Sequence, residues 1–241
     1  MSSFIYWQNF NISDDDIQAL KLAINDRQVG AETKLHSFNA GSGLLYPINQ
    51  GFTLNNSKFV YSPEKLRYGN TLGEDAFRAL NNDTAPDFSN IHSPFASLSR
   101  DESTNKTELA IDKVGICKLY YMVKENSLIV SNRLDLIASL TKPQISPQAI
   151  FNFIDSHVIP SPLTIYQNIF KLEPAEKIIF CEGTIDKLRY WTPIFTDENR
   201  ASMAELESQG RDALENAVKN HTPNAQTGAF LSGGLDSSTV S

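Results

Sequence analysis

The amino-acid sequence predicts an α+β protein in which residues 1–195 form one domain and residues 196–241 begin a second. Short apolar runs separated by turn residues fill the middle of the chain, which is typical of antiparallel strands. From residue 202 the pattern changes to an amphipathic helix, a short apolar strand and a glycine-rich loop, which is how an α/β unit begins. With 41% hydrophobic and 20% charged residues among 241, the chain can bury an ordinary core.

The first 94 residues predict short elements. Ser13 precedes three aspartates, and negative charges there favour the start of a helix that runs to about residue 24. The same three aspartates could form a metal site, which is the minor alternative. Glycine, proline and asparagine predict irregular chain at 41–56. The other expected elements are strands at 4–7 and 59–61, a helix at 73–80 and a loop at 81–90.

The middle of the chain predicts a meander, which is a run of antiparallel strands joined by tight turns. Its three apolar runs are separated by segments in which Gly115 and Asn126 tolerate turn dihedrals. Pro147 then opens a helix with apolar positions at Ile150, Phe151, Phe153 and Ile154. The strands are expected at 108–112, 117–123 and 127–131, a short helix at 134–140, and a last hairpin at 177–181 and 188–191.

Charge and cysteine content exclude several classes of protein. The net charge of −7 and the lack of clustered Lys and Arg argue against a nucleic-acid partner. Cys117 and Cys181 lie in apolar runs and match no disulfide or metal spacing, so both are expected to be buried free thiols. No apolar run is long enough for a membrane helix, and the N-terminus lacks a basic region followed by a hydrophobic core, so we expect no membrane partner and a cytoplasmic location.

The run Ser-Gly-Gly-Leu-Asp-Ser-Ser at 232–238 predicts a phosphate-binding loop. Gly233 and Gly234 lack a Cβ, so backbone N–H groups there can approach phosphate oxygens. The hydroxyls of Ser232, Ser237 and Ser238 add donors, and a helix starting near residue 235 directs its positive end at the anion. No Gly-Lys-Ser/Thr follows, so this is not the loop of the common nucleotide hydrolases.

Asp236 is the candidate metal ligand of this loop. A carboxylate among phosphates is repelled unless a hard cation lies between them, which makes Asp236 a candidate ligand of Mg²⁺. The alternative is an aspartate that simply favours the start of a helix.

These motifs resemble the glutamine-hydrolysing asparagine synthetase family. The loop after Phe230 and Leu231 resembles the entry to the family's synthetase domain, so the resemblance implies that Leu231 and residues 232–234 and 236–238 bind ATP with Mg²⁺. Residues 94–195 also resemble the family, through Phe95-Ala96, Asp112 with Gly115, Leu119-Tyr120-Tyr121, Leu172-Glu173-Pro174 and Tyr190-Trp191. The fold implied is the αββα sandwich of N-terminal-nucleophile hydrolases, followed by the first helix, strand and loop of an ATP pyrophosphatase domain.

Ser2 occupies the position of the family's catalytic cysteine. That cysteine attacks the glutamine side-chain amide with its thiol, so a serine there, and the lack of recognisable glutamine-binding segments before Pro94, predict a degenerate glutaminase domain. Ser2 could itself be an N-terminal nucleophile or an ordinary exposed serine. His36, His92, His157 and His221 share no spacing with either cysteine, so no Cys/His pair is expected.

The resemblance implies an ATP-dependent ligase that activates a small carboxylate as an acyl-adenylate and joins it to an amine or ammonia. Two alternatives are a relative that closes a macrolactam or β-lactam ring, and a non-catalytic scaffold or regulatory module. The sequence also leaves open whether the protein forms a homodimer. We expect the chain to be the N-terminal part of a longer protein, interrupted shortly after the loop.

Overall fold

The structure is a computed structural model that describes residues 3–26, 33–38, 42–47, 52–55, 58–83, 85–195, 201–221 and 228–240. The chain forms two compact units, Met1–Thr192 and Pro193–Ser241. None of the helices in these described ranges combines the length and the apolar content needed to cross a bilayer.

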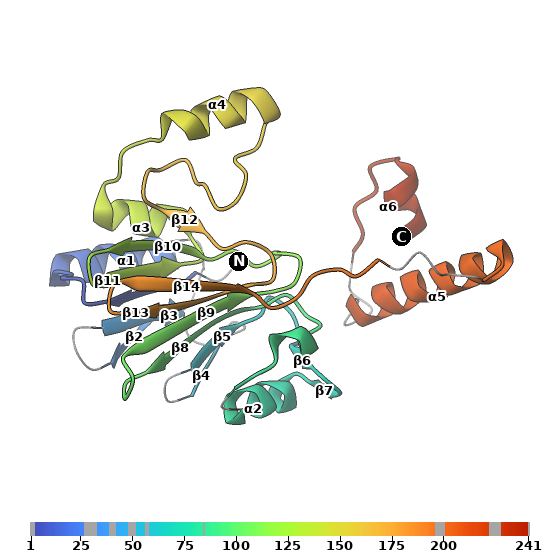
Figure 1. Ribbon diagram of the computed structural model, residues 1–241, viewed down its shortest axis with the longest axis horizontal. Coiled ribbons are helices and arrows are strands. Elements are labelled where there is room, and N and C mark those ends of the chain that lie inside the picture. Colours follow the sequence, from blue (N-terminus) through green and yellow to red (C-terminus); the bar gives the residue numbers. More distant parts are fainter. Residues whose placement is uncertain are drawn as a thin grey trace. The chain divides into compact units, whose positions relative to one another are not determined.

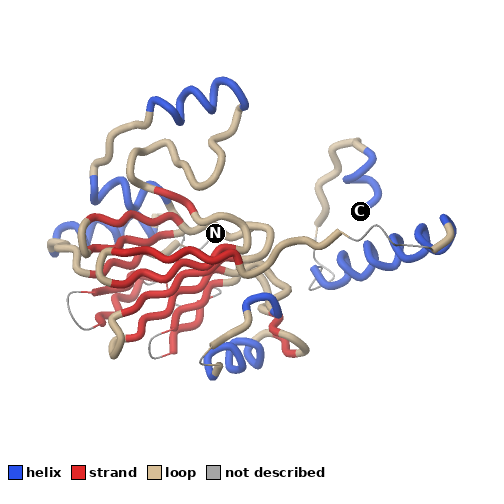
Figure 2. The backbone as a smooth tube through the Cα atoms, viewed as in Figure 1, coloured by secondary structure: helices blue, strands red, loops and turns tan. Residues whose placement is uncertain are grey.

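The first unit contains two six-stranded antiparallel sheets, seen in red in Figure 2. One sheet has the order β12-β10-β11-β1-β3-β2, with strands Phe170–Lys171, Tyr120–Lys124, Ser127–Ser131, Ile5–Gln8, Ser42–Pro47 and Thr33–Phe38. The other has the order β14-β13-β9-β8-β5-β4, with strands Thr184–Arg189, Glu176–Cys181, Lys106–Ile111, Ala96–Asp101, Lys58–Tyr61 and Phe52–Asn55. A small pair, β6 (Arg67–Tyr68) with β7 (Thr71–Leu72), lies outside both sheets.

The sheets pack face to face through every second residue of their strands. On β1 the side chains of Phe4, just before the strand, and Tyr6 point inward, and the Phe4 ring lies 4.8 Å from that of Phe59 on β5. The alternate residues Ile5 and Trp7 point outward and belong to a second apolar cluster. This period of two is what the pleat of a strand imposes, so one strand contributes to two layers of the core.

Helices cover the outer faces, which completes the αββα sandwich (Figure 1). α1 (Asp14–Asn25) and α3 (Leu134–Thr141) pack on the sheet that contains β1, burying Leu20 and Ile24 from α1 and Leu136 and Ile137 from α3. On the other sheet, α2 (Glu74–Asn82) and the short 3₁₀ helix Phe88–Asn90 bury a third cluster around Leu66 and Phe95. The predicted fold class is confirmed.

The predicted start of the first helix is also confirmed. The Ser13 hydroxyl accepts a hydrogen bond from Asp16 N–H at 3.1 Å, and the Asp16 carboxylate accepts one from Ser13 N–H at 3.2 Å. This reciprocal capping box satisfies two N–H groups that the first turn leaves without helical partners. Among the described residues no three His, Cys, Asp or Glu side chains gather in a metal-binding arrangement, so the three aspartates form a helix start.

The prediction of irregular chain at 41–56 is wrong, because β3 and β4 lie within it. The glycine that suggested a loop has a packing role in a strand. Gly43 is paired with Trp7, and a Cβ at Gly43 would come within 2.4 Å of the indole ring. Glycine inside a strand often marks such a close approach.

The predicted meander is wrong at its first turn. β9 and β10 belong to different sheets, and only the β10–β11 hairpin matches the prediction. The chain between them crosses from one sheet to the other in a turn that is held by hydrogen bonds to Asp112. In the β10–β11 turn the residue with a positive φ is Glu125, at 54°, whereas its neighbour Asn126 is the residue expected to tolerate turn dihedrals.

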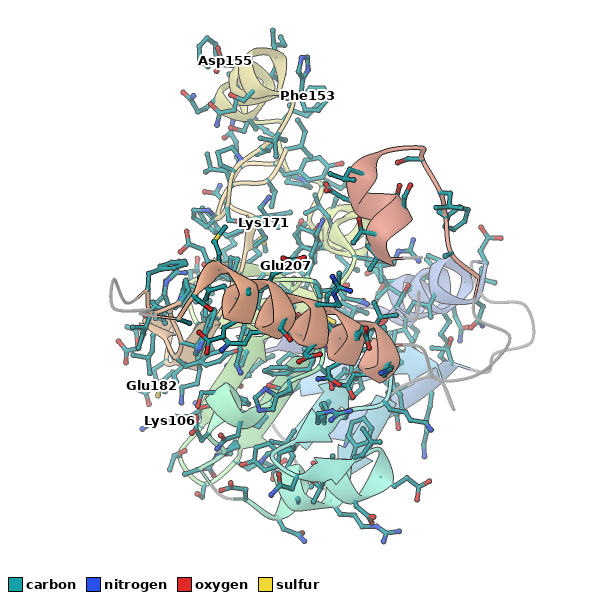
Figure 3. The ribbon with its side chains drawn as sticks, turned by 90° about the vertical axis from the view of Figure 1, so that its right-hand side faces the viewer. Lys106, Phe153, Asp155, Lys171, Glu182 and Glu207 are labelled. Atoms are coloured by element: carbon teal, nitrogen blue, oxygen red, sulfur yellow. The ribbon has the colours of Figure 1, made fainter. Side chains whose placement is uncertain are left out.

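The helix predicted after Pro147 is present as α4 (Pro147–Ser156), but its apolar residues are not in the core. Ile150, Phe151, Phe153 and Ile154 are all exposed, with Phe153 54% accessible, and Ala149 is the residue of α4 that is buried. Figure 3 labels Phe153 and Asp155 on this helix, which stands away from the two sheets. The bonds Ser146 N–H to Ile165 O and Gln167 N–H to Gln144 O attach its N-terminal end.

The second unit contains α5 (Met203–His221) and α6 (Leu235–Val240). The prediction of a strand at 228–231 is wrong. These residues form no strand and are exposed, and Leu231 is 65% accessible. A strand needs a hydrogen-bonded neighbour, and no described strand pairs with this segment. The predicted helix before it and the loop after it are present.

Candidate functional site

The loop at 232–238 is closed by its serine side chains. The Ser232 and Ser237 hydroxyls lie 2.9 Å apart across the loop, and Ser232 N–H donates to Ser237 Oγ at 3.3 Å. Gly234 N–H donates to Ser232 Oγ, and Gly234 O accepts from Ser238 N–H at 3.2 Å as α6 begins. Three of the predicted serines therefore fold the backbone into a compact turn at the start of a helix.

The two glycines of this loop have different roles. Gly233 has φ of +80°, a region that residues with a Cβ rarely adopt, and no atom lies within 4 Å of a Cβ built there. A Cβ at Gly234 would lie 3.3 Å from Ser232 Oγ. The backbone at Gly233 therefore faces open space, which is what a phosphate oxygen needs to reach main-chain donors.

Asp236 lies in the first turn of α6 and is exposed. A single carboxylate with no second acidic neighbour does not enclose a metal ion by itself. Mg²⁺ usually takes one or two carboxylates and completes its octahedron with phosphate oxygens and water. The donor set of this loop is compatible with a metal that arrives with a nucleotide.

The other candidate, Ser2, lies outside the described residues. The chain next to it is held firmly: Phe4 N–H donates to Asn132 Oδ1 at 2.9 Å, and Ser131 Oγ donates to Phe4 O at 2.6 Å. Ser3, two residues before β1, is buried. The N-terminal strand is therefore fixed at the sandwich end that carries Asn132.

The thiol of Cys117 does not have the properties of a nucleophile. Cys117 is buried, and burial, with a contribution from the nearby Asp112 charge, raises the pKa of its thiol to about 12. A thiol with such a pKa stays protonated at neutral pH and is a weak nucleophile. Cys181 is the last residue of β13 and is a free thiol of intermediate burial.

Asp112, which belongs to one of the motifs in the sequence, has a defined structural role. Its carboxylate accepts hydrogen bonds from the backbone N–H groups of Val114, Ile116 and Cys117 at 3.2, 2.9 and 2.8 Å. Its carbonyl oxygen accepts from Ala175 N–H at 3.0 Å. An aspartate that follows an apolar run and precedes a glycine by three residues is the sequence signal for such a turn.

Comparison with known proteins separates the chain into two matched segments. The family model for a glutamine amidotransferase domain matches residues 84–191, and the model for asparagine synthase matches residues 209–241, which include the loop. A putative glutamine-hydrolysing asparagine synthetase 2 of Methanocaldococcus jannaschii is 36% identical over 141 residues, covering 54% of this chain and 26% of that protein. Together these matches support an N-terminal segment of an asparagine synthetase-family protein.

Other relatives have the same pattern of coverage. Glutamine-hydrolysing asparagine synthetase 1 of Bacillus subtilis is 28% identical over 63% of this chain and 24% of its own length. Amidase chry2 of Gibberella zeae is 26% identical over 63% of this chain and 23% of its own. The chain therefore spans about a quarter of the length of the curated relatives it matches.

Among solved structures, glutamine phosphoribosylpyrophosphate amidotransferase from B. subtilis is similar with a TM-score of 0.46 and 10% identity, over 80% of this chain and 50% of that chain. The glutamine amidotransferase family model matches residues 84–191, which lie within the sandwich.

Proposed function

We propose that the complete protein is an ATP-dependent ligase that forms an amide bond from a small carboxylate and an amine or ammonia. The observation that carries the proposal is the loop at 232–238, inside the segment that matches asparagine synthase. An oxygen of the substrate carboxylate attacks the α-phosphorus of ATP and pyrophosphate leaves. The nitrogen nucleophile then attacks the acyl carbon, and AMP leaves as the amide forms.

In this proposal the loop binds the polyphosphate of ATP. The open backbone at Gly233 and the hydroxyls of Ser232 and Ser237 supply donors to the departing pyrophosphate, and Asp236 shares Mg²⁺ with its oxygens. Donors already in position stabilise the charge that develops on the leaving group without reorganising. Leu231 leads the chain into the loop.

The loop can be tested by changing its carboxylate in the complete protein. Asp236→Ala is expected to lower the affinity for Mg²⁺-ATP at least tenfold, because the ion loses its protein ligand. Asp212→Ala, which removes an exposed aspartate from α5, is the matched control and should leave the affinity unchanged. Equal ATP affinity in Asp236→Ala and the unchanged protein would overturn this assignment of the loop.

We also propose that the sandwich does not hydrolyse glutamine. Support comes from Ser2 in place of the family cysteine and from Cys117, whose thiol is buried and has a raised pKa. The complete protein should then form its amide from ammonia or from an amine, and glutamine should not replace them. The measurement is glutamate release from glutamine; release that disappears in Ser2→Ala would reject this part of the proposal and identify Ser2 as the nucleophile.

A further inference from the structure

A polar cluster lies buried between the two sheets, in a layer that is otherwise apolar. It is formed by Tyr6 and Gln8 on β1 and by Arg100 and Thr107 on β8 and β9, and Ser42 at the start of β3 flanks it. All five residues are buried, with Gln8 at 0% and Arg100 at 3% exposure. Figure 3 labels Lys106, the residue before Thr107, which marks this end of the sandwich.

The cluster is joined by hydrogen bonds that run from one sheet to the other. Arg100 Nη1–H donates to Thr107 Oγ1 at 3.3 Å, and Thr107 Oγ1 donates to Gln8 Oε1 at 2.6 Å. The Tyr6 hydroxyl donates to the same Gln8 oxygen at 3.1 Å. In this arrangement the oxygen of the Gln8 amide faces both hydroxyl groups.

With its oxygen used in this way, the amide nitrogen of Gln8 has no partner among the described residues. The same is true of Arg100 Nε, and both atoms are fully shielded from solvent. Both are N–H donors that cannot accept a hydrogen bond. Leaving a buried donor unpaired costs about 1–3 kcal/mol, and more for a charged group, so this arrangement calls for an acceptor.

Arg100 also lacks a counter-charge. Its hydrogen-bond acceptors are two neutral oxygens, Thr107 Oγ1 and, at 2.5 Å from Nη2, Asn105 Oδ1, and no described carboxylate lies within ion-pair distance of it. The neighbouring Asp101 carboxylate is occupied by the Ser103 and Thr104 hydroxyls of its own exposed turn. An arginine stays charged in proteins, so the positive charge must be balanced in another way.

Tyr6 does not provide that balance. Burial raises the pKa of its phenol, and although the Arg100 charge and the Thr107 hydroxyl act in the opposite direction, the net direction is upward. Tyr6 therefore remains a neutral hydroxyl at physiological pH. The five residues of the cluster include one permanent positive charge and no negative group, and the Glu102 carboxylate acts on Tyr6 from outside the cluster. Three buried polar atoms of the cluster, Gln8 Nε2, Arg100 Nε and Ser42 Oγ, have no hydrogen-bond partner within the required geometry among the described residues.

We propose that this cluster binds a small monovalent inorganic anion, such as chloride, held by Arg100 Nε and Gln8 Nε2. A single-atom anion accepts hydrogen bonds from several directions and neutralises the guanidinium, whereas a water molecule supplies no charge. Larger oxyanions do not suit a position between sheets whose backbones lie about 10 Å apart with side chains filling the gap. The bound ion joins the two sheets at this end of the sandwich.

Crystals of the unchanged protein grown in sodium bromide test the site directly, because bromide replaces chloride and scatters anomalously. The expected result is an anomalous peak in contact with Arg100 Nε and Gln8 Nε2. A water molecule at that position, an acceptor from another part of the chain, or no density would each overturn the proposal.

A solution test measures the melting temperature in sodium chloride against sodium gluconate at equal ionic strength. Because an anion that binds the folded state alone stabilises it, the melting temperature should be higher in chloride, by roughly 2–4 °C, and should saturate as the concentration rises. Arg100→Met is expected to abolish the difference between the two salts. Arg78→Met removes an exposed arginine of α2 and should preserve that difference.

If Arg100→Met does not fold, the chloride dependence of the unchanged protein and the bromide peak still decide the question. Equal melting temperatures in chloride and gluconate at every concentration, or a difference that Arg78→Met removes as well, would count against the site.

Discussion

At the scale of single residues, one carboxylate directs the chain from one sheet to the other. Asp112 follows β9, and its oxygens collect three backbone N–H groups from the next five residues. Gly115 completes the turn with φ of +71°, and a Cβ there would lie 3.2 Å from the Pro174 ring. The same burial that protects these bonds raises the pKa of the Cys117 thiol. This turn therefore has a structural role.

Replacing that carboxylate should destabilise the sandwich strongly. Asp112→Asn exchanges one charged acceptor oxygen for an NH₂ group that faces backbone donors, so we expect a loss of about 2–4 kcal/mol in the free energy of unfolding. Urea denaturation followed by circular dichroism measures this loss.

The control is Asp75→Asn on α2, where the carboxylate is exposed and lies 3.7 Å from Arg78. Exposed ion pairs contribute little, so its effect should stay below about 0.5 kcal/mol. Similar losses in the two variants would show that the three hydrogen bonds to Asp112 do not stabilise the fold.

Residue roles could be predicted where the chemistry is local in sequence. Gly233, Ser232 and Ser237 lie within six positions of one another, so their pattern alone indicates a loop with free backbone donors. The buried link from Thr107 to Gln8 joins residues 99 positions apart. No local pattern identifies such a pair, because its members meet only after the two sheets have packed.

At the scale of elements, two hairpin turns from different sheets meet at Gly183. Glu182 and Gly183 form the turn between β13 and β14 with φ of 47° and 80°. A Cβ on Gly183 would lie 2.5 Å from Glu125 O, in the turn between β10 and β11. The glycine is therefore needed both for its dihedral angle and for the space beside it.

The same substitution should have opposite effects at two glycines. Gly183→Ala should lower the free energy of unfolding by about 1–3 kcal/mol, because it adds strain and a clash with a backbone oxygen. Gly210→Ala lies inside α5, where nothing is within 4 Å, and should increase helix stability by up to about 1 kcal/mol.

Urea denaturation measures the first effect, and the far-ultraviolet helical signal during heating measures the second. If Gly183→Ala were neutral, the two turns would have to move apart without cost, which the close approach in the structure argues against.

Elements could be predicted where the periodicity or the caps are strong, as for α1, α4 and the β13–β14 hairpin. The sheet to which each strand belongs could not be predicted, because β9 and β10 are both apolar runs although they lie in different sheets. The exposure of α4 could not be predicted either, because packing leaves its apolar residues Phe151 and Ile154 in solvent. Whether an apolar helix face is covered depends on tertiary contacts that the local sequence does not contain.

At the scale of the whole molecule, burial is distributed unevenly along the chain. The buried hydrophobic residues of the described chain end at Phe180, while the apolar residues of the second unit, including Met203, Phe230 and Leu235, are exposed. The glutamine amidotransferase match ends at residue 191, close to the end of the first unit at Thr192. Three apolar clusters therefore account for the core of the first unit by itself.

A chain that ends at Thr192 should for this reason retain the stability of the sandwich. Its melting temperature is expected to lie within about 2 °C of that of the 241-residue chain, because the residues of all three apolar clusters lie before Thr192. The helical signal of α5 should disappear with the truncation. A helix of 19 residues is marginal in water without tertiary packing, so its contribution in the longer chain should melt gradually and at lower temperature. Differential scanning calorimetry distinguishes these outcomes. One cooperative transition with the same midpoint in both chains supports the assignment of the core. A midpoint that is lower by more than about 10 °C in the shorter chain would mean that residues after Thr192 help to stabilise the sandwich.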